Sequence, residues 1–362
     1  MDGFDVSGGL VYDNLTHSPI GVRYHTEKPG IHWYDANLAQ IFDDLDDGSG
    51  ELTADFVGFG PNMESLILSI ESDRQNPSLI SLDLATSGTR PLLLQYPAWP
   101  DEAFNPMEPI SFMSGDGHRI HGYLTRGQGV SADQPAPTIL KVHGGPGGRA
   151  SWGFSPRTQF FSALGFNVLQ INYRGSKGYG WLTGRPLIEI LERAPSDLID
   201  GISWAVEQGI AEEGRIGAIG FSLGAYLVME VAARDPDLLS AVAAWGGVYD
   251  WPRQYQRDSA GFLRAWVTAA YLNFEDEKER FERASVIHKA DRIRIPVYLF
   301  HGGSDGRVSP EQARMMRRAL RQSGADLKYE VSTWDVHGFP DQSSRIRYFS
   351  NVGQFFVDHM LK

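Results

Sequence analysis

Length, composition and charge restrict the classes of protein to which this chain can belong. Its 362 residues are 42% hydrophobic and 22% charged, a globular composition that excludes a disordered chain. The net charge of −12 argues against binding to a phosphate backbone, and the absence of cysteine excludes disulfides, a thiolate nucleophile and cysteine-ligated zinc. No apolar run approaches the ~18 residues of a membrane span and the acidic start does not resemble a signal peptide, so we expect a cytoplasmic protein without nucleic-acid or membrane partners.

Acidic residues are concentrated in the first hundred positions, which carry 15 acids and four bases, whereas the remaining chain is nearly neutral. Short apolar and β-branched runs separated by turn residues predict a β-meander in this region. Strands are expected at residues 8–13, 20–26, 31–36, 54–60, 65–72, 78–85 and 91–96. We therefore expect an acidic β-segment over residues 1–105, followed by prolines between residues 97 and 109 that interrupt regular structure.

Residues 106–362 form a second domain in which strand and helix patterns alternate. This alternation predicts an α/β fold, with a mostly parallel sheet covered by helices on both faces. The expected strands are residues 120–124, 138–142, 167–172, 216–221, 241–245, 297–301 and 328–332. The expected helices are residues 196–208, 223–234, 310–322 and 344–361.

A Gly-x-Ser-x-Gly pattern at residues 220–224 lies between a predicted strand and a predicted helix. In that context the turn is so sharp that Ser222 is exposed at the helix N-terminus, where unpaired N–H groups favour a developing negative charge. A glycine-rich turn that serves packing alone is the alternative. Ser222 is therefore a candidate nucleophile that needs a base and an acid elsewhere in the chain.

The acid and the base can come from two residues that lie much later in the sequence. Asp305 follows the predicted strand at residues 297–301, and His337 follows the next one at residues 328–332. Both would lie at the carboxyl edge of the sheet, in the order serine, aspartate, histidine that this architecture uses. Each alone could be an ordinary loop residue, but together they predict a catalytic triad.

A glycine-rich loop at residues 143–148 follows the predicted strand at residues 138–142. Glycines would let backbone N–H groups approach a reacting carbonyl, and the N–H of Leu223 would supply a further donor to the oxyanion. The Lys-Ser/Thr pair of a phosphate-binding P-loop is absent from this segment, so a phosphate site is disfavoured. A simple tight turn remains an alternative.

Five ordered motifs resemble the catalytic domain of the prolyl oligopeptidase family, closest to its acylaminoacyl-peptidase and dipeptidyl-aminopeptidase-like branch. They are residues 142–146, 172–180, 220–224, 301–308 and 337–339. The resemblance covers residues 107–362 and implies an α/β-hydrolase fold and a serine peptidase without cofactor or metal. It also implies that Ser222 is the nucleophile, Asp305 the orienting acid and His337 the general base, with the N–H groups of Gly145 and Leu223 as the oxyanion hole.

The chain departs from the family pattern in two ways. Around the nucleophile it has Phe221, Leu223 and Ala225, which make the elbow similar to that of general esterases. The family also carries a β-propeller before this domain, whereas about a hundred residues are present here. We expect these to be a propeller remnant or part of a longer propeller, with unpaired strand edges that favour homo-oligomers.

The function expected from these residues is hydrolysis of short peptides or acyl substrates through an acyl-enzyme. Tyr249 and Trp251 follow the predicted strand at residues 241–245 and are candidates for lining a substrate pocket, although core packing explains them equally well. A carboxylesterase acting on small esters is an alternative function. An inactive hydrolase-fold binding protein is a second alternative.

Overall fold

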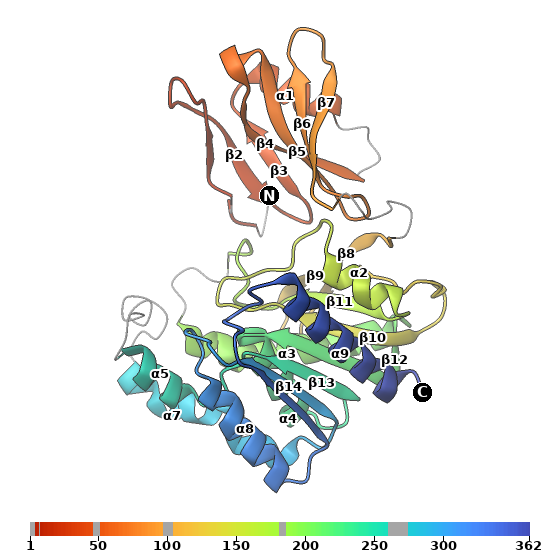
Figure 1. Ribbon diagram of the computed structural model, residues 1–362, viewed down its shortest axis with the longest axis vertical. Helices are drawn as coiled ribbons and strands as arrows, with labels where there is room; N and C mark the ends of the chain where they lie inside the picture. The colour runs from red at the N-terminus through yellow and green to blue at the C-terminus, as the bar shows by residue number, and fades with distance from the viewer. Residues whose placement is uncertain (1–3, 7, 46–50, 97–103, 181–185, 260–273) are drawn as a thin grey trace. The chain divides into compact units, whose positions relative to one another are not determined.

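The computed structural model describes residues 4–6, 8–45, 51–96, 104–180, 186–259 and 274–362 (Figure 1). The chain divides into two compact units. The first consists of Met1–Pro109 with two later stretches, Ser151–Phe160 and Lys177–Gly180, and the second contains the remainder. Part of the proline-rich stretch expected to follow the β-segment, residues 97–103, lies outside the described residues.

Two antiparallel sheets make up most of the first unit, one with the strand order β1-β2-β3 and one with the order β4-β5-β6-β7. Apolar side chains that alternate along the strands, such as Leu66 and Leu68 of β5, are fully buried between these elements. The strands are β1 Leu10–Tyr12, β2 Pro19–His25, β3 Pro29–Trp33, β4 Leu52–Phe59, β5 Ser65–Ser72, β6 Ser78–Asp83 and β7 Thr89–Leu94. A short 3₁₀ helix at Pro61–Met63 connects β4 to β5.

One helix, α1 (Ala36–Leu45), interrupts these strands and was not predicted from the sequence. The carboxylate of Asp35 caps it, because Oδ1 accepts hydrogen bonds from the N–H groups of Asn37 (2.9 Å) and Leu38 (3.0 Å). Leu38 is buried, and Phe42, one turn later, packs against the same cluster. Apolar residues at a spacing of three to four are typical of an amphipathic helix. This helix is short, so its pattern was not distinguished from those of the neighbouring strands.

The second unit is built on an eight-stranded sheet with the order β15-β14-β13-β12-β10-β11-β9-β8. Strands β10 to β15 run parallel to their neighbours, and β9 is antiparallel to β11. Strands β13 and β14 are buried at every residue, which explains their continuous apolar sequence. The strands are β8 Met107–Met113, β9 Arg119–Thr125, β10 Ala136–Val142, β11 Asn167–Asn172, β12 Ala211–Phe221, β13 Ala241–Trp245, β14 Val297–Gly302 and β15 Leu327–Ser332.

Helices cover both faces of this sheet (Figure 1). Buried side chains of α3, α4 and α8 form one large cluster with the strands, while α9 packs on the opposite face, where Phe356 meets Gly217. No helix in the described ranges is both long and apolar enough to cross a bilayer. The helices are α2 Pro156–Ala163, α3 Leu187–Glu207, α4 Leu223–Arg234, α5 Trp251–Ser259, α7 Phe274–Ala284, α8 Pro310–Gln322 and α9 Gln342–Met360, with a 3₁₀ helix at Val286–Arg292. This arrangement is the α/β-hydrolase fold.

Helix α3 starts nine residues before the expected position because it continues through Pro195. A proline inside a helix removes one backbone hydrogen bond and normally ends the helix. Here Leu191, Ala194 and Leu198 lie on a face that is completely buried, so the burial of this face compensates for the lost bond. Helices α2, α5 and α7 were not predicted.

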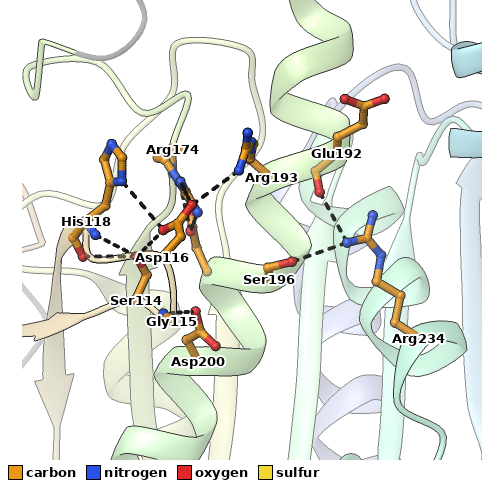
Figure 2. Close-up of polar contacts among 11 residues, drawn as sticks. Ser114, Gly115, Asp116, His118, Arg174, Glu192, Arg193, Ser196, Asp200 and Arg234 are labelled. Carbon is orange, nitrogen blue, oxygen red and sulfur yellow. Dashed lines mark hydrogen bonds and ion pairs between the residues drawn. The ribbon is translucent and has the colours of Figure 1, made fainter.

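A buried arginine joins three elements of the second unit. The guanidinium of Arg174, in the loop after β11, makes hydrogen bonds of 2.5 to 3.1 Å with both carboxylate oxygens of Asp197 on α3. It also donates to Asp116, in the turn between β8 and β9 (Figure 2). The hydrogen bond from Arg174, with a second from Ser114, holds the pKa of Asp116 well below its usual range. Arg174 therefore ties the β8–β9 turn and α3 to the end of β11.

A second contact between the same elements lies beside this arginine. Asp200, one turn after Asp197 on α3, accepts a hydrogen bond of 2.8 Å from the backbone N–H of Gly115 (Figure 2). Arg193, one turn before Asp197, adds a longer contact of 3.3 Å to Asp116. The turn is thus held to α3 from several positions along the helix.

We expect Asp197→Ala to lower the free energy of unfolding by about 3–5 kcal/mol, because the change leaves the Arg174 charge buried without its bidentate partner. Asp116→Ala is the matched control. Asp116 is partly exposed and its removal leaves the Asp197 pair intact, so a loss of about 1–2 kcal/mol is expected. Urea unfolding of the full chain measures both values, and equal losses would contradict the role given to Asp197.

Candidate active site

Ser222 occupies the turn between β12 and α4 in a strained backbone conformation. Its φ of 56° and ψ of −121° are outside the regions that non-glycine residues favour. The backbone N–H of Ser222 donates to the carbonyl oxygen of Trp245 at 2.9 Å, which fixes the turn to the end of β13. This geometry projects the hydroxyl from the carboxyl edge of the sheet.

The two glycines of the turn are required by close backbone contacts. A Cβ atom at Gly220 would lie 2.1 Å from the carbonyl oxygen of Gly224, and one at Gly224 would lie 2.4 Å from that of Val142 on β10. Both distances are far below any permitted contact, so larger residues would force strand and helix apart. The Gly-x-Ser-x-Gly spacing thus has a steric cause in this structure.

The structure brings together the three side chains that the sequence singled out. His337 Nε2 lies 3.0 Å from Ser222 Oγ, and His337 Nδ1 lies 2.7 Å from Asp305 Oδ2. The loops after β14 and β15 carry Asp305 and His337, so all three residues follow parallel strands at one sheet edge. The ring of Phe221 packs beside the imidazole, with a centroid distance of 4.8 Å.

Asp305 is buried yet well supplied with hydrogen-bond donors. Burial by itself raises the pKa of Asp305, but hydrogen bonds from His301, His337 and the Val308 N–H outweigh it and hold the pKa well below the usual range. Oδ1 accepts the N–H groups of Arg307 and Val308, each at 2.8 Å. Asp305 is therefore an ionised carboxylate with a fixed orientation toward His337.

The glycine-rich loop after β10 is held in place by the segment that follows β11. The ring of His143 stacks on Tyr173, with centroids 4.3 Å apart, and the Tyr173 hydroxyl donates to the His143 carbonyl oxygen at 3.0 Å. Burial lowers the pKa of His143 to about 4, so the ring is neutral. Its Nδ1 donates to the Gly144 carbonyl at 2.8 Å, and its Nε2 lies 2.8 Å from Ser176 Oγ, whose hydroxyl donates to the Tyr173 carbonyl oxygen at 2.8 Å. Residues of the 172–180 motif therefore position the loop that contains Gly145.

A pocket of about 180 Å³ lies directly beside Ser222. Gly145 and Leu223, the candidate oxyanion donors, are both among its lining residues, and so is Trp251, which was considered for substrate binding. Tyr249, considered alongside it, is fully buried and does not line the pocket. Its backbone N–H donates to Gln312 Oε1 at 2.9 Å, which draws this residue toward α8 and into the core.

Among the pocket residues that were missed in the sequence, two lie on α5. Gln254 and Asp258 follow Trp251 at positions i+3 and i+7, and all three lie on one face of α5. This spacing could have revealed them, had the polar stretch after Trp251 been predicted as a helix. No cluster of three or more His, Asp or Glu side chains that could hold a metal ion occurs in the described part of the chain.

Comparison with curated proteins finds similar sequences among peptidases. Dipeptidyl aminopeptidase BIII of Pseudoxanthomonas mexicana is 28% identical over 283 residues, which cover 71% of this chain and 39% of that protein. Acylamino-acid-releasing enzyme 2 of Oryza sativa subsp. japonica is 27% identical over 237 residues, covering 62% of this chain and 30% of that protein. The chain thus spans well under half the length of these relatives.

Solved structures share the fold. A structure of puromycin hydrolase superposes with a TM-score of 0.81 at 20% identity and covers 99% of this chain and 55% of that one. The acylaminoacyl peptidase of Pyrococcus horikoshii has a TM-score of 0.75 at 21% identity, covering 94% of this chain and 54% of that one.

A family model adds a direct assignment to these similarities. The model described as the prolyl oligopeptidase family matches residues 152–362, more than half of the chain, and this range contains Ser222, Asp305 and His337. The chain belongs to the prolyl oligopeptidase family.

Proposed function

We propose that this protein is a serine peptidase that cleaves short or N-blocked peptides through an acyl-enzyme. The observation that carries the proposal is the hydrogen-bonded chain from Ser222 Oγ through His337 to Asp305. A serine hydroxyl becomes an effective nucleophile when a neighbouring imidazole takes its proton, and the imidazole needs a carboxylate to fix its tautomer. Peptide substrates are favoured because one relative is named a dipeptidyl aminopeptidase and another an acylamino-acid-releasing enzyme.

In the first half-reaction, Ser222 Oγ attacks the carbonyl carbon of the scissile amide while its proton passes to His337 Nε2. The carbonyl oxygen becomes an oxyanion, for which the backbone N–H groups of Gly145 and Leu223 are the proposed donors. The C–N bond then breaks, and the leaving amine takes the proton from His337. Asp305 stays ionised and stabilises the imidazolium.

In the second half-reaction, water attacks the ester carbonyl carbon of the acyl-enzyme while His337 accepts a proton from it. The tetrahedral intermediate collapses, the acid product leaves, and the proton returns from His337 to Ser222 Oγ. Activated esters follow the same route, because they differ from amides in the leaving group alone. Esterase activity therefore accompanies the proposed peptidase activity.

We expect Ser222→Ala to lower kcat/KM on an activated acyl ester by at least about a thousandfold, because the nucleophile is lost. A fluorophosphonate probe should label the wild-type protein stoichiometrically at Ser222 and leave the variant unlabelled. Mass spectrometry of the labelled peptide makes the measurement. Full activity of Ser222→Ala would rule out the mechanism, and an unlabelled wild-type protein would instead favour an inactive binding protein.

Activity is expected to fall in acid, because a protonated His337 cannot accept the Ser222 proton. Protonation of Asp305 should add no second step to the acid side of the pH–activity profile, since the pKa of Asp305 lies well below the usual carboxyl range. The log of kcat/KM should therefore rise with pH with a slope of one and then level off. Circular dichroism over the same pH range is the control for unfolding, and a folded protein with pH-independent activity would contradict a histidine base.

Peptidase and esterase functions are separated by comparing two substrates. A peptidase is expected to hydrolyse an N-acetyl-aminoacyl 4-nitroanilide as well as a short-chain 4-nitrophenyl ester, both dependent on Ser222. The anilide has a poor leaving group, which a site built for amides must protonate from His337. Rapid ester cleavage without measurable anilide cleavage would assign the chain to the carboxylesterases instead.

A further inference from the structure

The pocket beside Ser222 contains a buried carboxylate that the mechanism above does not use. Asp258 lies on α5, is 2% exposed, and is one of the residues that line the pocket. The rest of the lining combines apolar residues, such as Leu187, Val248 and Trp251, with the polar side chains of Ser222, Gln254 and Arg307. An ionisable group in such surroundings is costly unless a partner offsets its charge.

Few partners are available to this carboxylate. Gln254, one turn earlier on α5, donates to Asp258 Oδ1 at 2.9 Å, while Oδ2 accepts no hydrogen bond from the described residues. Burial raises the pKa of Asp258, and the hydrogen bond from Gln254 and the charge of Arg257 offset part of this effect. The carboxylate is therefore left with an unused acceptor oxygen beside the pocket.

Two arginines lie near Asp258, but neither forms an ion pair with it among the described residues. Arg257, the preceding residue on α5, donates instead to the carbonyl oxygens of Gly306 (2.7 Å) and Arg307 (2.8 Å). Arg307 lines the same pocket. Since no described residue supplies a paired cation, we take the partner of Asp258 to be a group that enters the pocket.

The pocket lies on the acyl side of the bond to be cleaved. His337 must pass its proton to the leaving group, so the leaving group lies on the His337 side of Ser222. Among the described residues that line the pocket, both proposed oxyanion donors are present and His337 is absent. The side chain of the residue that forms the acyl-enzyme therefore enters this pocket.

We infer that Asp258 makes the enzyme select substrates whose acyl residue carries a positively charged side chain, such as that of lysine or arginine. The inference rests on the acyl-transfer function proposed above and adds its substrate class. An ammonium or guanidinium group in the pocket would give Asp258 Oδ2 a charge-assisted hydrogen bond. A neutral side chain of the same length would leave that oxygen without a donor.

Matched thiobenzyl esters of N-acetyl-lysine, N-acetyl-norleucine and N-acetyl-glutamate test this inference. The wild-type protein is expected to show a kcat/KM for the lysine ester on the order of tenfold to a hundredfold above that for the norleucine ester. Asp258→Asn should lower the lysine value and bring the ratio close to one, while the norleucine value changes little. Glu279→Gln removes an exposed carboxylate on α7 and controls for net charge, so its ratio should stay at the wild-type value.

Each outcome decides between named alternatives. Equal turnover of the lysine and norleucine esters would overturn the inference, and so would a lysine preference that persists in Asp258→Asn. In either case, Ser222-dependent hydrolysis of the norleucine ester would still support the proposed function. A preference for the glutamate ester would overturn it as well and point to Arg307 as the charge that selects the substrate. Failure to hydrolyse any of the three esters would contradict the proposed function itself.

A measurement on the wild-type protein keeps the inference testable if Asp258→Asn does not fold. Pentylammonium should inhibit hydrolysis of the norleucine ester competitively, with an inhibition constant about tenfold or more below that of 1-pentanol, its neutral counterpart. Equal or weaker inhibition by pentylammonium would overturn the inference.

Discussion

The candidate site depends on one backbone constraint, the left-handed conformation of Ser222 between β12 and α4. A conformation of this kind costs on the order of 1–3 kcal/mol and persists where the surrounding structure fixes it. Here the Ser222 N–H is bonded to the end of β13, and the contacts at Gly220 and Gly224 leave no room for a wider turn. The rest of the site is arranged around a hydroxyl whose place is decided by the packing of strand, helix and sheet.

The other two members of the hydrogen-bonded chain are held by loops, and the loops are held by polar contacts. Asp305 is fixed by backbone N–H groups from its own loop, and its low pKa reports that these donors outweigh its burial. The glycine-rich loop that contains Gly145 depends on His143, whose neutral ring is stacked on Tyr173. Arg174, which follows Tyr173, is anchored to Asp197 of α3, so the support of the loop extends to this helix.

Strands buried on both faces could be predicted from the sequence, because a short continuous apolar run between turn residues is typical of them, and β11 and β13 have the predicted bounds. Residues that follow such strands could be predicted with them, which is why Ser222, Asp305 and His337 were identified. Helix α5 could not be predicted from the sequence, because it is mostly polar. Its buried face is made of Trp251, Gln254 and Asp258, a pattern without apolar periodicity. Tyr249 and Trp251 were indistinguishable because their placement depends on residues distant in the chain: the Tyr249 N–H donates to Gln312 on α8, and the Trp251 N–H donates to Ser285.

Two buried carboxylates near Ser222 have pKa values shifted in opposite directions, and the difference separates their roles. Asp305 receives hydrogen bonds on both oxygens from the chain itself, so its charge is stabilised whether or not a substrate is present. Asp258 receives one hydrogen bond, from Gln254, and burial raises its pKa. A carboxylate that only orients His337 is best stabilised when all of its hydrogen bonds are already formed in the free protein. One that selects a substrate must instead keep an acceptor free until the substrate brings the donor, because selectivity comes from interactions that the wrong substrate leaves unpaired.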